Sequence, residues 1–163
     1  MDTVEKLLDA TERRIRREGY HAVSFRDLAD DLGIKSASVH YHFRRKEDLG
    51  AAVVERYAER FFQRIDGAAD PLGAYVDAFE AALKEGDAIC LCGVLGAEAV
   101  GLPEDVAAAV RRFFAKNLDW LTGHLGDRTR AVLTLAALEG AMVLAKSQGD
   151  YSLFDTVAGE LRG

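Results

Sequence analysis

The chain has 163 residues, of which 49% are hydrophobic and 29% charged, the composition of an ordinary globular protein with enough apolar material for a core. Its formal net charge is −6, so any basic surface must be confined to one part of the chain. The two cysteines are too few for a disulfide framework and fit a reducing cytoplasm. We expect no signal peptide, no membrane span in the apolar stretch 131–146, and few strands, because the chain has two prolines and few β-branched runs.

The first predicted helix covers residues 3–19. Its apolar stripe consists of Val4, Leu7, Leu8 and Ile15. Gly19 is expected to end the helix, and the arginines of its last turns suit the negative end of the helix dipole.

A pair of short helices is predicted next. Ser24 is a suitable N-cap, and a helical spacing of apolar residues follows it. These residues are Phe25, Leu28, Ala29 and Leu32. Gly33 permits the left-handed backbone that ends a helix, and Ser36 offers an N-cap for a second helix that runs to about Phe43. Two short helices joined by a glycine turn are typical of a helix-turn-helix.

The segment from Gly33 to Lys46 contains four basic residues and no acidic ones, which favours DNA as its partner over a merely solvated face. We expect Lys35, Ser36, Ser38 and His40 to lie near base edges, Tyr41, His42, Ser24 and Lys46 to contact phosphates, and Arg26 to contact the DNA backbone. No metal site is expected, because His40 and His42 are two residues apart and point to different sides of a helix.

The run from Ser24 to Val53 resembles the DNA-binding domain of the TetR family of bacterial transcriptional regulators. The resemblance rests on Phe25, Leu28, Ala29, Gly33, Tyr41, Phe43, Lys46 and Leu49 and on the amphipathic helix that follows. It covers about the first 55 residues. It implies an all-α protein with a helix-turn-helix DNA-binding domain at residues 1–48 and a helical ligand-binding and dimerisation domain at residues 49–163.

The helix predicted from about Arg45 to Ile65 connects the two domains. Its stripe repeats every four residues through Leu49, Val53, Tyr57 and Phe61. The turn-rich run 66–73 marks a joint, beyond which acidic residues outnumber basic ones. The C-terminal half should therefore repel DNA and serve another purpose.

Five further helices are predicted, and the fourth of them, residues 128–148, is apolar on nearly all sides. The first of the five starts near Leu72, and the second spans residues 90–100. The third has Pro103 in its first turn, and the fifth spans residues 151–161. A helix without a polar face must be covered on several sides, so we expect a second subunit there. The predicted homodimer interface consists of Ala136, Ala137, Gly140, Ala141, Leu144 and Phe154.

Aromatic and apolar residues of the C-terminal helices are candidates for an effector cavity, although each taken alone is more typical of core. They are Phe61, Tyr75, Phe79, Cys92, Leu95, Phe113, Trp120 and Met142, and Glu98 is a candidate for a polar group in the same site. The TetR resemblance implies that a small molecule bound here spreads the DNA-binding domains and lowers DNA affinity.

The predicted function is therefore a dimeric, cytoplasmic transcriptional repressor that a small molecule releases from a palindromic operator. Two alternatives stay open: a repressor that senses oxidants or electrophiles through Cys92, and a helical dimerisation module that binds no DNA. We expect neither enzyme activity nor a cofactor, because the chain contains no Gly-rich phosphate loop, no HExxH and no GxSxG.

Overall fold

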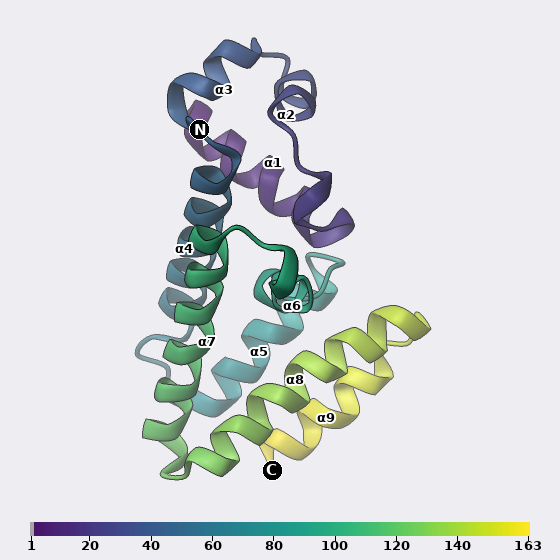
Figure 1. Ribbon diagram of the computed structural model, residues 1–163. Helices are drawn as coiled ribbons and strands as arrows, with labels where there is room; N and C mark the ends of the chain where they lie inside the picture. Colours follow the sequence, from purple (N-terminus) through teal and green to yellow (C-terminus); the bar gives the residue numbers. More distant parts are fainter. Residues whose placement is uncertain (1) are drawn as a thin grey trace.

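A computed structural model describes residues 2–163, and throughout that range the regular elements are helices (Figure 1). Their order is α1 (Thr3–Glu18), η1 (Tyr20–Ala22), α2 (Phe25–Leu32), α3 (Ser36–His42), α4 (Lys46–Ile65), α5 (Pro71–Lys84), α6 (Leu91–Ala97), η2 (Ala99–Gly101), α7 (Glu104–Leu125), α8 (Arg128–Gln148) and α9 (Ser152–Arg162). The all-α prediction is confirmed. Helices α1–α3 form one end of the molecule, and α5–α9 form the other.

The helix-turn-helix forms as its local sequence predicts. The Ser24 hydroxyl oxygen accepts a hydrogen bond from the Asp27 amide at 3.1 Å, and Gly33 ends α2 in the left-handed region with φ 63°. Leu28 and Val39 are fully buried and hold α2 and α3 together. One boundary differs from the prediction: Lys35 is the N-cap of α3 and Ser36 is its first helical residue.

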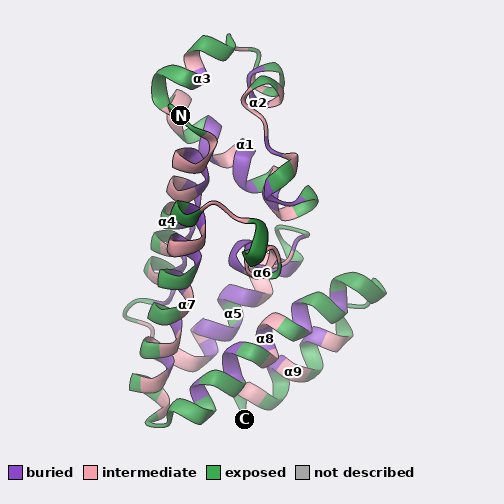
Figure 2. Ribbon diagram, viewed as in Figure 1, coloured by how far each residue is buried: buried purple, intermediate pink, exposed green. Residues whose placement is uncertain are grey.

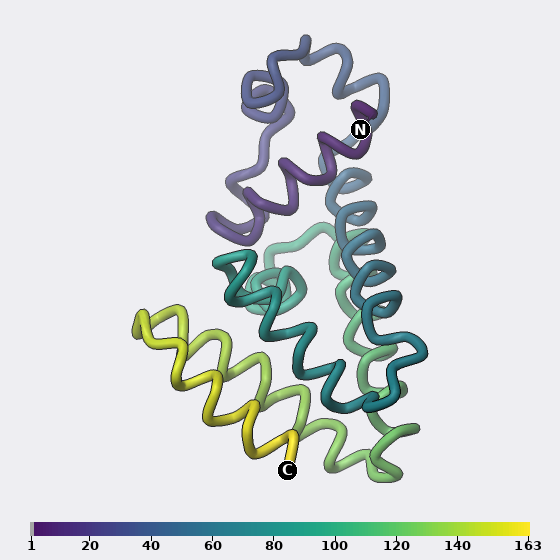
Figure 3. The backbone as a smooth tube through the Cα atoms, turned by 180° about the vertical axis from the view of Figure 1, so that it is seen from behind, coloured from purple at the N-terminus to yellow at the C-terminus, as the bar shows by residue number. Residues whose placement is uncertain are grey.

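Helix α4 is the connector. It leaves the end of α3, passes α1 and continues alongside α7 (Figures 1 and 3). Its predicted stripe faces inward, with Leu49 and Val53 fully buried and Tyr57 nearly so. A single rigid helix therefore contributes side chains to both cores.

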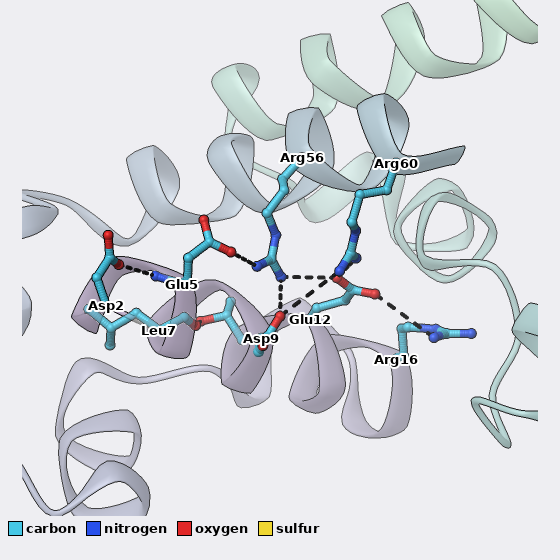
Figure 4. A network of polar contacts seen from close by, with 9 residues as sticks. Asp2, Glu5, Leu7, Asp9, Glu12, Arg16, Arg56 and Arg60 are labelled. Atoms are coloured by element: carbon cyan, nitrogen blue, oxygen red, sulfur yellow. Dashed lines mark hydrogen bonds and ion pairs between the residues drawn. The ribbon is translucent and has the colours of Figure 1, made fainter. Parts of the chain in front are cut away.

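Charged side chains join α1 to α4 (Figure 4). Arg56 of α4 contacts Glu5 at 2.9 Å, Asp9 at 2.7 Å and Glu12 at 3.3 Å, and Arg60 contacts the same Glu12. Only 13% of the Arg56 side chain and 11% of the Glu12 side chain are exposed, so the ion pair between these two residues is poorly screened. We infer that α1 moves with α4 when the connector moves.

The predicted helix at residues 90–100 is shorter than expected. Regular α6 ends at Ala97, and the 3-10 turn η2 follows it. At this point the Glu98 carboxylate turns toward the DNA-binding end and accepts a hydrogen bond from the Tyr20 amide at 2.9 Å. Pro103 precedes α7 as its N-cap and does not lie in its first turn.

Helix α8 has one buried side and one exposed side (Figure 2). Leu138, Met142 and Ala145 are fully buried against the rest of the chain. The exposed apolar side chains are Val132 at 45%, Leu133 at 63%, Val143 at 50% and Leu144 at 54%. By length and composition α8 also passes as a membrane span, a test that the core helices of soluble proteins pass as well.

Candidate DNA-binding surface and candidate effector site

Helix α3 carries its polar side chains outward. Tyr41 is 85% exposed, and Lys35, Ser36, His40 and His42 are exposed beside it. Val39 holds the opposite side of the short helix in the core. An exposed helix with lysine, serine, histidine and tyrosine donors suits phosphates and base edges in a major groove.

The entrance to α2 lies beside this surface. Arg26 is exposed, whereas Ser24 and Ser38 are partly buried. The Ser24 oxygen is used as an acceptor by the Asp27 amide, which leaves the hydroxyl hydrogen free to donate to a phosphate. Of the nine residues predicted to contact DNA, eight therefore have side chains placed around α3 and the start of α2.

Lys46 is the ninth, and its side chain turns inward. Its Nζ lies 4.3 Å from the centre of the Tyr20 ring, and burial lowers the pKa of Lys46. Arg45 is paired with Asp48, at 2.5 Å, and with acidic neighbours. Arg44 is exposed and appears in none of the ion pairs of residues 2–163, whereas Arg45 is 56% exposed but engaged by acidic partners, so Arg44 is the basic side chain of this run that is free to meet DNA. The sequence shows that Arg44, Arg45 and Lys46 form a basic cluster. Which of the three side chains points outward depends on the residue at which α4 begins.

We therefore expect Arg44→Ala to weaken DNA binding more than Lys46→Ala. Loss of one phosphate contact should reduce the slope of log K against log salt by about 1. Titration of a DNA duplex at several salt concentrations measures this slope. An unchanged slope for Arg44→Ala together with a reduced slope for Lys46→Ala would reverse the assignment.

The residues predicted to line an effector cavity are mostly packed core. Phe61 lies 5.4 Å from Tyr75, 5.5 Å from Phe79 and 5.8 Å from Phe113, measured between ring centres. Tyr75, Phe79, Cys92, Leu95, Phe113 and Met142 are each at most 2% exposed. Their own side chains occupy the space in which a ligand was expected. Glu98 lies elsewhere, at the joint with Tyr20.

A groove-shaped cavity of about 540 Å³, open to solvent, lies next to this core between α4 and α7. Its apolar lining includes Val54, Ala58, Phe62, Phe113 and Trp120. Its rim is charged, and it is made up of Glu55, Glu59, Asp66, Arg112 and Lys116. Ligand sites commonly have this size and a largely apolar lining with few polar groups. Of the nine residues predicted for the effector site, Phe113 and Trp120 border the cavity.

Cys90 and Cys92 are both buried. Burial raises the pKa of the Cys90 thiol, but hydrogen bonds from Cys92, Tyr57, the Gly93 amide and Glu139 outweigh it and lower the pKa. Burial and the neighbouring Cys90 raise the pKa of Cys92. Cys92, the residue of the redox alternative, is therefore the less reactive of the two thiols.

Glu139 of α8 is a buried acid beside these cysteines. Burial, with help from Cys90, raises its pKa to about 10, and its Oε1 atom has no hydrogen-bond partner among residues 2–163. A side chain on Gly93 would come within 2.5 Å of its Oε2 atom. The carboxyl group therefore lies directly against the Gly93 backbone, and its raised pKa keeps it protonated at neutral pH.

Glu139→Gln should stabilise the protein increasingly as the pH rises. Folding raises the pKa of Glu139 from the usual glutamate value of 4.5 to about 10, so the stability that the bound proton contributes is complete below 4.5 and is lost as the pH approaches 10. Glutamine has no proton to lose. Wild type should lose about 1.4 kcal/mol of unfolding free energy per pH unit in this window, so the melting temperature of the variant relative to wild type should rise by roughly 8 °C or more between pH 6 and pH 9. An equal difference at both pH values would mean that Glu139 is already ionised in the folded protein.

The residues predicted for the dimer interface divide into two groups. Ala136, Gly140 and Leu144 are exposed on α8 and Ala137 is partly exposed, whereas Ala141 and Phe154 are 2% and 0% exposed within a single chain. The last two are core residues of the single chain: Ala141 is on the buried side of α8, and Phe154 belongs to α9, which packs onto α8. The exposed apolar residues Val132, Leu133 and Val143 extend the first group.

Comparison with known proteins relates both ends of the chain to regulators. The family model described as bacterial regulatory proteins, tetR family, matches residues 7–53. An HTH-type transcriptional regulator of Lactococcus lactis, from the lacX 3′ region, is 25% identical over 177 residues, which cover 95% of this chain and 89% of the relative. The transcriptional regulator AcuR of Cereibacter sphaeroides is 30% identical over 118 residues, which cover 65% of this chain and 53% of AcuR.

The likeness in fold covers almost the whole chain. A TetR transcriptional regulator from Legionella pneumophila superposes with a TM-score of 0.90 at 28% identity, over 99% of this chain and 96% of that one. The similarity therefore includes the C-terminal helices, which the family model does not match.

Proposed function

The chain belongs to the TetR family of bacterial transcriptional regulators, and from this premise we propose that two copies act together as a repressor that a small molecule releases from a palindromic operator. The observation that carries the proposal is the presence, in one chain, of an exposed polar helix α3 and an uncovered apolar side of α8. The first feature suits a nucleic acid and the second suits a protein partner. Binding to chromosomal DNA also implies a cytoplasmic location.

Helix α3 is proposed to lie in the major groove of the operator. Lys35, Ser36 and His40 are exposed at positions from which they can reach base edges, while Tyr41 and Arg44 contact phosphates. One helix of seven residues makes few base contacts. Two DNA-binding domains on successive grooves, roughly 34 Å apart or more, supply the missing specificity.

The exposed side of α8 supplies the contact between the two copies. Gly140 has open space where a side chain would start, so a partner helix can approach its backbone closely. Leu133 and Leu144 flank it along the same side of the helix. A two-fold interface uses the same patch on both copies, which matches one self-complementary apolar strip.

The effector is proposed to be a small, largely apolar molecule that binds between α4 and α7. The cavity of about 540 Å³ borders the connector over more than two turns, from Val54 to Phe62. A ligand that separates α4 from α7 shifts α4, and α1 follows because of the ion pairs of Arg56 and Arg60. DNA affinity falls only if the ligand prefers the shifted state.

Selection of bound duplexes from a random DNA pool tests the proposal. The expected product is a palindrome with two short half-sites, because two identical domains read it. Recovery of single half-sites would contradict the dimer, and recovery of no common sequence would contradict sequence-specific regulation. The same duplex then serves for titrations with candidate effectors.

A further inference from the structure

One arginine ties the end of α1 to the C-terminal half of the chain. Arg16 Nε donates a hydrogen bond to the Ile89 carbonyl at 2.9 Å, and its Nη2 donates to the carbonyls of Ala82, at 2.9 Å, and Ala88, at 3.0 Å. Only 12% of the Arg16 side chain is exposed. The acceptors lie in the last turn of α5 and in the connection to α6, where helix carbonyls lack partners and carry negative partial charge.

The fit between the guanidinium and this connection is close. A side chain at Gly86 would meet the Ala82 carbonyl oxygen at 2.6 Å and Arg16 Nη1 at 3.1 Å. The planar fork of arginine places several N–H groups on carbonyls that converge from different residues. A lysine at position 16 keeps the charge and loses this geometry.

The same connection is held from its other side by Asp87. Its backbone has φ 46°, a conformation that residues other than glycine adopt only when their surroundings hold them there. Its carboxylate accepts hydrogen bonds from Lys146 Nζ at 2.7 Å and from the Tyr151 hydroxyl at 2.6 Å. Lys146 is in the last turn of α8, and Tyr151 precedes α9. Figures 1 and 3 show the α5–α6 connection between the end of α1 and the α8–α9 turn.

We propose that Arg16 and Asp87 are positioning residues for operator binding, which hold each DNA-binding domain at a set orientation to the α8 dimer helices. The inference rests on the proposed function, because orientation matters only if two domains must match two half-sites. Neither residue needs to touch DNA. Their role is to transmit the geometry of α8 to α1 through residues 85–90.

The mechanical reason is the number of attachments. Helix α4 alone joins the two halves covalently, and a single helix permits bending and rotation about its own axis. The Arg16 contact at the far end of α1 adds a second attachment, and the Glu98 bond to the Tyr20 amide adds a third nearby. The Arg16 attachment continues, through the ion pair and hydrogen bond of Asp87, to Lys146 of α8 and to Tyr151 before α9.

The test compares two duplexes: the selected palindrome and the same duplex with one half-site scrambled. The variants are Arg16→Lys, Asp87→Gly, which keeps the positive φ and removes the carboxylate, and Tyr151→Phe, which removes one hydroxyl. Arg111→Lys is the matched control, because Arg111 pairs with Glu104 on the exposed surface of α7. Helical circular dichroism and sedimentation verify that each variant is folded and dimeric.

Arg16→Lys and Asp87→Gly should weaken binding to the palindrome about tenfold, a factor typical of coupling between two sites. The affinity of both variants for the duplex with a single half-site should stay within about twofold of wild type. They should also tolerate one or two base pairs inserted between the half-sites better than wild type does. Tyr151→Phe should act in the same direction with a smaller effect, and Arg111→Lys should match wild type. If Arg16→Lys does not fold, the other two variants carry the test.

Two failures are distinguishable. Wild-type protein that binds both duplexes equally would overturn the proposed dimeric function and this inference with it. A wild-type preference for the palindrome that persists in all folded variants, with the same spacing optimum, would overturn the positioning role alone. A lowered melting temperature without a change in spacing tolerance would assign these residues to stability only.

Discussion

Leu133→Glu combined with Leu144→Glu is expected to convert the dimer into a monomer and to lower affinity for the palindrome by about 100-fold or more. Both side chains are more than half exposed on the outer side of α8, so the substitutions leave the core of each chain intact. In a dimer they would bury four uncompensated carboxylates in an apolar contact, which is strongly unfavourable. Sedimentation velocity measures the first effect, and fluorescence anisotropy with labelled duplex measures the second.

Val100→Glu is the matched control for this prediction. Val100 is fully exposed in η2, away from α8, so it tests the same chemical change outside the proposed interface. It should leave mass and DNA affinity unchanged. A double variant of α8 that stays dimeric would show that another surface joins the two copies. A monomer that retains full affinity for the palindrome would show that dimerisation on α8 does not contribute to binding.

Tyr41→Ala is expected to lower operator affinity at least about tenfold without changing the melting temperature, since loss of a bond to a charged group costs about 1.5–3 kcal/mol. The side chain is 85% exposed and contributes little to the fold. Its hydroxyl is proposed to donate to a phosphate, so Tyr41→Phe should show most of the same loss. Fluorescence anisotropy gives the affinity and a thermal melt gives the stability.

Comparison of Tyr41→Ala with Tyr41→Phe separates the contribution of the hydroxyl group to DNA affinity from that of the aromatic ring. Full affinity in Tyr41→Phe with a loss in Tyr41→Ala would assign the role to the aromatic ring, as a contact with sugar or base. Full affinity in both variants would remove Tyr41 from the DNA surface. It would also weaken the placement of α3 in the groove, because this is the most exposed aromatic side chain of the chain.

Local sequence was sufficient for the helix-turn-helix and for most helix ends. Ser24 and Gly33 act through hydrogen bonds and backbone angles within a few residues of themselves, so their effect is readable without knowledge of the fold. The end of α6 was not readable, because Glu98 leaves the helix to bind an amide 78 residues away. The direction of Lys46 also depends on a distant partner, the Tyr20 ring.

The effector site shows a second limit. Aromatic residues at helical spacing predict an apolar interior in the C-terminal half, and that interior is present. Whether it is hollow depends on how rings from α4, α5 and α7 fit one another, and here they fill it. The cavity lies instead on the outer side of this cluster, between α4 and α7. Side-chain packing of distant helices decides such a question, and periodicity along one helix does not.

By itself the sequence determined the helical class, the helix-turn-helix and an α8 that is apolar on nearly all sides, because these follow from hydrophobic spacing, capping residues and composition along short stretches. Only the tertiary structure decided that Arg44 faces outward, that Ala141 and Phe154 are core, and that Arg16 and Asp87 join α1 to α8. Each of these depends on contacts between segments distant along the chain. Such contacts arise when the whole chain packs, and no local pattern records them.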